Sequence, residues 1–165
     1  MNKTLKQITL IGILTALYVV FSLTLKIPMG IGAIALDLGY IVLTVSSFKV
    51  GRWAAFVGSV GAGIESILFS PYGISYGWIV MNIIIGLICG TLFNKFDGKR
   101  KYLYCIITIL LAILIGVTAK TIIECSLYSI PYIAKIPKSA VAFGIDAVVM
   151  IIGLPIADRV NKIKI

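Results

Sequence analysis

The stretch ISYGWIVMNIIIGLICGTLF, residues 74–93, contains twenty residues and no charged side chain. A helix needs about 20 mostly apolar residues to cross the hydrocarbon core of a membrane, so this stretch predicts a transmembrane helix. Five further stretches have a similar apolar character: residues 8–25, 31–48, 53–69, 102–125 and 139–157. We therefore expect an all-α integral membrane protein in which residues 1–165 form one domain of six transmembrane helices.

The composition of the chain excludes a soluble globular protein. Apolar residues make up 60% of the 165 residues and charged residues 13%, whereas an ordinary soluble domain has about 45–50% and about 25%. The chain has no histidine, which excludes histidine-based catalytic triads and histidine-rich metal sites. Its three cysteines are an odd number without paired spacing, so they indicate neither a disulfide framework nor a zinc site, and we expect them to pack as small apolar residues.

The basic residues are distributed unevenly between the two ends of the predicted helices. Eleven of the fifteen lysines and arginines lie at the ends that include both termini and the 94–101 loop, three lie at the opposite ends, and Lys120 lies within a helix. Because cytoplasmic loops carry an excess of Lys and Arg, we expect both termini in the cytoplasm and a multi-pass protein of the cell membrane. The net charge of +9 is thus a topology signal, and we expect a lipid bilayer but no nucleic acid as a partner.

Polar side chains within the predicted helices gather in the outer half of the membrane. At about 1.5 Å per residue, Glu65 lies about 20 Å from the cytoplasmic side, and Asn82 and Asp146 lie about 9 and about 12 Å below the outer side. Intramembrane charges cost about 2.5–3.5 kcal/mol each and usually serve a function or form pairs. We therefore expect a polar ligand site that opens outward. Three further ionisable groups lie at or near the outer surface: Asp37, Lys120 and Glu124.

Aromatic side chains at the same depth complete the predicted site. They can stack on a flat ring, or they can form the aromatic belt that is common at membrane interfaces. The connections over residues 26–32, 70–77 and 126–137 are rich in Pro, Gly, Ser and Tyr, and we expect them to cover the site. The predicted site residues are Asp37, Glu65, Tyr76, Trp78, Asn82, Lys120, Glu124, Tyr128 and Asp146.

Structural roles remain open for some of these residues. Lys120 and Glu124 are four residues apart on one helix face and could neutralise each other. Asp37 could serve as the cap of its helix.

Small residues on the first predicted helix indicate a contact face. Gly12 and Ala16 are four residues apart, so another helix backbone can approach closely there. This face could bind a partner helix, or it could pack inside the six-helix bundle.

Three stretches resemble the substrate-binding S components of energy-coupling factor (ECF) transporters, the vitamin importers of prokaryotes. GILTALYVVFS, residues 12–22, resembles the A-x-x-x-A helix of that family. IALDLGYIVLTVSSFKVGRWAAFVGSVGAGIES, residues 34–66, and KIPKSAVAFGIDAVVMIIGLPIAD, residues 135–158, resemble the I-D-L-G-D and G-L-P-L regions of one subgroup. Tyr40 stands where the subgroup often has Asp.

The resemblance implies a binding subunit and not an enzyme. In this family six helices hold a vitamin near the outer surface, and a transmembrane T component with two ATPase subunits energises uptake. The chain has no G-x-x-x-x-G-K-[ST] motif, so ATP would be used by the partner subunits and no cofactor is expected here. An autonomous transporter would need polar groups along the whole path, and a membrane enzyme would need catalytic spacings such as D-x-x-D or E-x-x-H.

The predicted site chemistry favours a flat heterocycle as the ligand. Carboxylates beside amide and aromatic groups suit a ring with N–H donors or a cationic nitrogen. This favours a pyrimidine or pyridine vitamin or precursor, such as hydroxymethylpyrimidine or pyridoxine. Riboflavin, folate and pantothenate are the alternatives.

Overall fold

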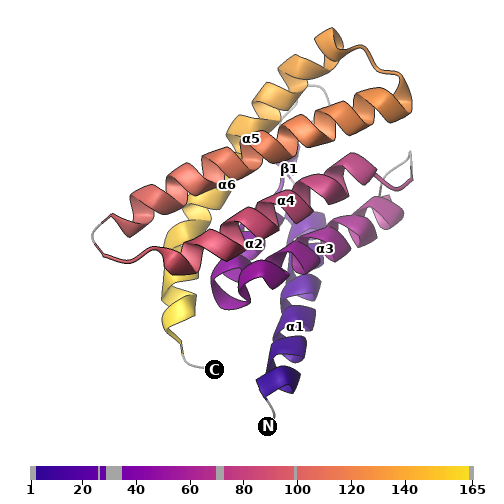
Figure 1. Ribbon diagram of the computed structural model, residues 1–165. Coiled ribbons are helices and arrows are strands. Elements are labelled where there is room, and N and C mark those ends of the chain that lie inside the picture. The colour runs from indigo at the N-terminus through magenta and orange to yellow at the C-terminus, as the bar shows by residue number, and fades with distance from the viewer. Residues whose placement is uncertain (1–2, 26, 29–34, 70–72, 99, 164–165) are drawn as a thin grey trace.

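The computed structural model describes residues 3–25, 27–28, 35–69, 73–98 and 100–163, which form a bundle of helices (Figure 1). Strands β1 (Ile27–Pro28) and β2 (Ala35–Leu36) pair in antiparallel fashion between the first two helices. Two short 3-10 helices, η1 (Gly51–Trp53) and η2 (Phe93–Lys95), precede α3 and follow α4. This nearly all-helical architecture confirms the predicted fold class. The six α-helices of the described chain are α1 (Lys3–Thr24), α2 (Gly39–Lys49), α3 (Ala54–Phe69), α4 (Tyr76–Leu92), α5 (Lys101–Tyr128) and α6 (Tyr132–Lys162).

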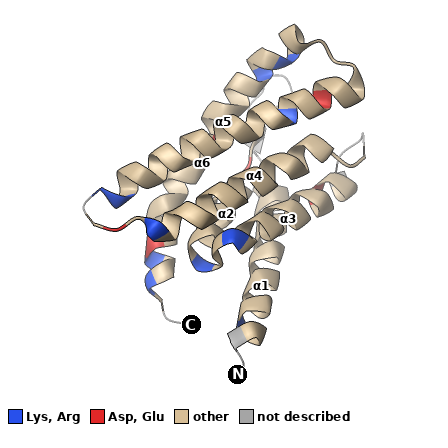
Figure 2. Ribbon diagram, viewed as in Figure 1, with Lys and Arg blue, Asp and Glu red and all other residues tan. Residues whose placement is uncertain are grey.

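The bundle has two chemically different ends. Both termini lie at one end, together with η1, η2 and most of the lysines and arginines (Figures 1 and 2), and we call this the basic end. The opposite end carries β1, β2 and the connections from α3 to α4 and from α5 to α6, and we call it the distal end. The uneven distribution of charge that the sequence indicates is therefore also an uneven distribution in space.

Four helices of the described chain are long and apolar enough to cross a membrane: α1, α4 continued by η2, α5 and α6. At 1.5 Å per residue, the 11 residues of α2 extend about 16 Å and the 16 residues of α3 about 24 Å, both short of the ~30 Å hydrocarbon core. The helix expected over 31–48 is shorter in the structure, because residues 35–36 belong to β2 and the helix begins at Gly39. Residues 31–34 lie outside the described part. Conversely, the helix expected from residue 139 begins at Tyr132.

Helix α2 lies in the interior of the bundle. Eight of its eleven residues are buried, although several of them carry hydroxyl groups. Thr44, Ser46 and Ser47 each donate a hydrogen bond to the backbone carbonyl four residues earlier, at 2.8–2.9 Å. Buried hydroxyls need such partners, and α2 supplies them from its own backbone. The short helix can therefore occupy the interior between α1, α3, α4 and α6.

An apolar core continues around α2 through the middle of the bundle. Its largest fully buried aliphatic and methionine side chains come from four helices, and the three cysteines are also buried and free. The bulky apolar residues on the outer faces of α1, α3, α5 and α6 are exposed instead, as they are in a helix that faces lipid. The large core residues are Leu43, Met81, Ile85, Ile109, Ile113, Met150 and Leu154.

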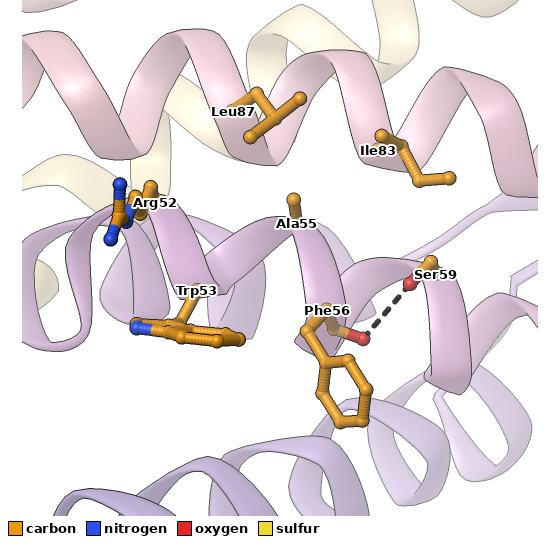
Figure 3. A pocket seen from close by; sticks show the side chains of 7 residues that line it. All are labelled: Arg52, Trp53, Ala55, Phe56, Ser59, Ile83 and Leu87. Carbon is orange, nitrogen blue, oxygen red and sulfur yellow. Dashed lines mark hydrogen bonds between the residues drawn. The ribbon is translucent and has the colours of Figure 1, made fainter.

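Helices α3 and α4 touch through their backbones near the basic end. A Cβ atom built on Gly86 would lie 2.5 Å from the Ala55 Cα atom, and one built on Gly90 would collide with the Gly51 carbonyl oxygen. Side chains of both helices stand on either side of this contact, with Ala55 at its floor (Figure 3). The small residues on α3 and α4 therefore serve packing within the bundle.

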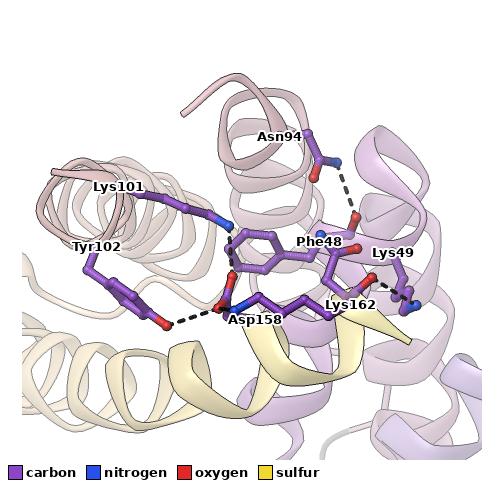
Figure 4. Close-up of polar contacts among 8 residues, drawn as sticks. Phe48, Lys49, Asn94, Lys101, Tyr102, Asp158 and Lys162 are labelled. Carbon is purple, nitrogen blue, oxygen red and sulfur yellow. Dashed lines mark hydrogen bonds and ion pairs between the residues drawn. The ribbon is translucent and has the colours of Figure 1, made fainter. Parts of the chain in front are cut away.

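Ion pairs, a hydrogen bond to a backbone carbonyl and a cation–π contact connect three helices at the basic end (Figure 4). The Asp158 carboxylate of α6 pairs with Lys101 at 2.8 Å and with Lys162 at 2.9 Å, and it accepts a hydrogen bond from the Tyr102 hydroxyl at 3.2 Å. The Lys101 ammonium also lies 5.1 Å from the centre of the Phe48 ring of α2. Lys49 donates to the Ile163 carbonyl oxygen at 2.7 Å. These contacts hold the ends of α2, α5 and α6 together.

We expect Gly86→Ala to destabilise the protein, because the new methyl group has no room against the Ala55 backbone. Such overpacking typically costs about 1–3 kcal/mol. The matched control is Gly144→Ala, also within a helix, where a Cβ atom would have nothing within 4 Å. Thermal unfolding in detergent should show a lower melting temperature for Gly86→Ala and an unchanged or slightly higher one for Gly144→Ala. Equal melting temperatures would contradict the close α3–α4 contact.

Candidate functional site

A buried group of polar and aromatic side chains lies toward the distal end, contributed by α1, α2, α3, α4, α5 and α6. Most of its members are almost fully buried, with exposed fractions of 0–5%, while Trp78 and Lys120 are partly buried. Ionisable groups at such depth in a membrane protein usually mark a site or a pair. We call this group the distal polar cluster: Tyr18, Ser22, Asp37, Tyr40, Glu65, Trp78, Asn82, Lys120 and Asp146.

Three carboxylates of the cluster interact electrostatically with two tyrosines. Asp37, Glu65 and Asp146 all lie within electrostatic range of the hydroxyls of Tyr18 and Tyr40. The sequence analysis placed these three acids at neighbouring depths, and the structure brings them together from α3, α6 and the start of α2. The result is an acceptor-rich interior that suits a ligand with several hydroxyl or N–H groups.

A positive charge and two aromatic rings lie beside these carboxylates. The Lys120 ammonium lies 4.1 Å from the centre of the Trp78 ring, a cation–π distance. The rings of Trp78 and Tyr40 are 6.2 Å apart and inclined by 60°. Lys120 and Asp146 also lie within electrostatic range of each other. Lys120 therefore interacts with both Trp78 and Asp146.

Asn82 links α1 to α4 at the centre of the cluster. Its side-chain carbonyl accepts a hydrogen bond from the Tyr18 hydroxyl at 3.1 Å, and its amide group donates to the Trp78 carbonyl at 3.0 Å. The side chains of Tyr18 and Asn82 are fully buried. These two bonds fix the orientation of the amide directly below Trp78.

Asp37 has a structural role in addition to its place in the cluster. One of its oxygens, Oδ1, accepts the Gly39 backbone N–H at 2.8 Å and the Ser22 hydroxyl at 2.8 Å. It thus binds the first residue of α2 from the position before the N-cap, which is Leu38 and not Asp37, and ties α2 to α1. A Cβ atom at Gly39 would collide with the Ser22 hydroxyl, so glycine is required for this contact.

Three predicted site residues lie at the rim of the cluster. Glu124 forms an ion pair with Lys135 of α6. The sequence analysis considered only Lys120, four residues earlier on the same helix, as a partner for Glu124. Tyr76 and Tyr128 are 55% and 45% exposed, and the Tyr128 hydroxyl lies 3.5 Å from the Ile74 carbonyl oxygen. Their exposure fits the interfacial-belt alternative better than stacking inside the cluster.

The predicted cover of the site falls partly outside the described chain. Of the connections expected to close over it, residues 26, 29–32 and 70–72 are not among the residues that the structure describes. The third connection, residues 126–137, is described throughout and is mostly helical, since α5 ends at Tyr128 and α6 begins at Tyr132. It contains Lys135, which pairs with Glu124.

The face of α1 that carries Gly12 and Ala16 is open. Both residues are exposed, and a Cβ atom at Gly12 would have nothing within 4 Å in the described structure. This differs from the alternative in which the face packs inside the bundle. Because α1 begins at Lys3, the two residues lie about 14 and about 20 Å along a helix of about 33 Å, near its middle.

Sequence reasoning missed three members of the cluster: Tyr18, Ser22 and Tyr40. The signal for the first two was their spacing, since residues four apart share one helix face. Tyr40 was noted only as a departure from a family motif, although its side chain is fully buried. Uncharged polar residues in an apolar helix are easily taken for tolerated substitutions.

The family model described as "ECF-type riboflavin transporter, S component" matches residues 2–162. The chain belongs to this S-component family. A solved S component for biotin from an ECF-type ABC transporter has the same fold, with a TM-score of 0.68. The two chains are 16% identical, and the alignment covers 99% of this chain and 96% of the other, so this likeness bears on the fold alone. No curated protein matches the sequence.

These comparisons confirm the resemblance and the predicted localisation. As an ECF S component, the chain is a multi-pass membrane protein of a transporter family. The leaning toward a pyrimidine or pyridine ligand receives no support from either comparison.

We expect the Tyr18–Asn82 hydrogen bond of this S component to behave as a coupled pair. Asn82→Leu leaves the buried Tyr18 hydroxyl without this acceptor and should cost about 1–3 kcal/mol. Combining it with Tyr18→Phe removes both partners, so the double variant should be more stable than the sum of the single effects predicts. Melting temperatures of the parent, single and double variants test this, with Tyr128→Phe as an exposed control. Strict additivity would contradict a direct bond.

Proposed function

We propose that this S component captures riboflavin at the distal polar cluster and delivers it to an ECF module for ATP-driven uptake. The observation that carries the proposal is the match of nearly the whole chain to the riboflavin-type family. The cluster supplies suitable chemistry at one end of the bundle. The excess of basic residues at the other end supports a cytoplasmic location for both termini.

The groups of the cluster complement the parts of riboflavin. The isoalloxazine ring is flat and aromatic, and the rings of Trp78 and Tyr40 offer surfaces for it. Its pyrimidine edge carries carbonyl acceptors and an N–H donor, which suit the Lys120 ammonium and the Asn82 amide. The ribityl hydroxyls suit the carboxylates of Glu65 and Asp146. Riboflavin therefore also contains a pyrimidine ring, the type of ring that the sequence favours in the ligand.

An energising partner is part of the proposal, because the interior near the basic end is apolar. The Phe48 and Phe93 rings lie 4.8 Å apart there and both are buried. An autonomous transporter would need a polar path through this region. We therefore infer a T component and two ATPase subunits as partners, with the open Gly12–Ala16 face of α1 as the docking surface.

Riboflavin should bind the purified protein in detergent and lose its flavin fluorescence as it binds. We expect Trp78→Leu to weaken binding roughly tenfold, because an aromatic pair is worth up to about 1.5 kcal/mol beyond simple burial. The matched control is Trp53→Leu, which removes the second tryptophan of the chain. Trp53 lies at the basic end, so its loss should leave riboflavin affinity unchanged.

The same titration distinguishes the competing ligands. Binding of hydroxymethylpyrimidine or pyridoxine without binding of riboflavin would contradict the ligand but leave the transport role intact. Equal loss of affinity in both tryptophan variants would contradict the location of the site.

Substitution of the α1 face should separate binding from transport. Ala16→Trp places a large side chain on the open face, so we expect riboflavin affinity to stay near that of the parent while ATP-driven uptake with the T component and ATPases is lost. The control is Ile13→Trp, which exchanges a bulky exposed residue on an adjacent face of α1. Uptake and co-purification of the T component are the measurements.

Two results would contradict this assignment. Loss of ligand binding in Ala16→Trp would mean that the face supports the fold of the isolated subunit. Equal loss of uptake in Ile13→Trp and Ala16→Trp would mean that the small residues are not the docking surface.

A further inference from the structure

A groove of about 360 Å³ runs along the outer surface of α3 and α4 near the basic end (Figure 3). We call it the Arg52 groove, after the residue at one end of it. It does not contain any member of the distal polar cluster. Its walls are formed by Arg52, Trp53, Phe56, Ser59, Ile83 and Leu87.

The groove exists because the two helices approach so closely. Gly86 rests on the backbone of Ala54 and Ala55, which leaves Ala55 as a shallow floor. In Figure 3 Leu87 on α4 and Phe56 on α3 lie on opposite sides of Ala55, and the Phe56 ring points away from α4. The groove that results is lined mainly by apolar side chains, which suit contact with a hydrocarbon chain.

The polar groups of the groove are concentrated at one end. In Figure 3 the Arg52 guanidinium and the Trp53 indole nitrogen both lie toward the left of the view, whereas Phe56, Ile83 and Ser59 lie farther to the right. Arg52 is exposed and forms no ion pair within the described part of the chain. The Ser59 hydroxyl donates to the Phe56 carbonyl oxygen at 3.1 Å, so its polarity is satisfied within α3.

We propose that the Arg52 groove binds an anionic phospholipid. The planar guanidinium of Arg52 pairs with the lipid phosphate, for which an arginine fork is well matched. Trp53 lies at the headgroup level, where tryptophan is enriched in membrane proteins. An acyl chain follows the groove past Leu87 to Phe56 and Ile83, toward the middle of the membrane.

Charge complementarity favours an anionic lipid over a zwitterionic one. The basic end carries most of the positive charge of a chain with net charge +9. Positive residues near a membrane surface attract anionic headgroups, each contributing to the preference. Trp53, Phe56 and Leu87 are 45%, 50% and 43% exposed, so in a membrane their apolar surfaces require a hydrocarbon cover.

The two tryptophans of the chain permit a local test. In a Trp78→Phe background Trp53 is the remaining tryptophan, so its fluorescence reports on the groove. The protein is reconstituted in nanodiscs that contain brominated phosphatidylglycerol or brominated phosphatidylcholine as a minor component. We expect brominated phosphatidylglycerol to quench Trp53 at a mole fraction about fivefold lower than brominated phosphatidylcholine requires. This is the preference expected from one basic residue at an anionic surface.

Matched arginine variants assign the preference to the groove. Arg52→Gln should abolish it, and Arg52→Lys should retain part of it because the charge remains without the fork. Arg100→Gln removes the same charge from an exposed position at the same end and should leave the preference intact. Melting temperatures of the variants confirm that each is folded.

Three outcomes would overturn the proposal. Equal quenching of Trp53 by both lipids would show no headgroup selectivity. A preference that persists in Arg52→Gln would come from the general charge of the basic end. Loss of T-component binding in Arg52→Gln, without selective quenching in the parent, would make the groove a protein-docking surface. Riboflavin binding is not involved in any of these measurements.

Discussion

The hydrocarbon interior of a membrane supplies no hydrogen-bond partners, so each polar group placed there must find one within the protein. The architecture of this S component follows from that constraint. Thr44 and its neighbours on α2 bond to their own helix, which allows a helix rich in hydroxyls to lie at the centre. Asp37 and Asn82 instead use partners on other helices, and their bonds join α1 to α2 and to α4. The buried polar groups thereby determine which helices must be neighbours.

The two ends of the bundle use charge in different ways. At the distal end, the carboxylates and Lys120 are buried or partly buried around aromatic rings, where charge is costly unless a partner or ligand compensates it. At the basic end, Asp158 pairs with lysines near the aqueous surface and holds the ends of α5 and α6 together.

The fold was largely predictable because long uncharged segments such as 74–93 have few alternatives to a membrane helix. The exception is α2, whose apolar sequence extends beyond the helix because strand pairing over 27–28 and 35–36 replaces its first turns. Depth counting predicted that polar side chains of several helices lie at one depth, since rise per residue is fixed by helix geometry. It could not identify partners across helices, such as Lys135 for Glu124, because these depend on helix rotation and on the path of distant segments.

The burial of all three cysteines has a practical consequence for chemical labelling. Cys89, Cys105 and Cys125 lie among packed side chains, and thiols react as thiolates at accessible, hydrated positions. The natural chain therefore behaves toward water-soluble maleimides as though it contained no cysteine. A single thiol introduced at either end becomes a unique attachment point for a spin label or fluorophore, without the loss of native packing that removal of the natural cysteines would cause.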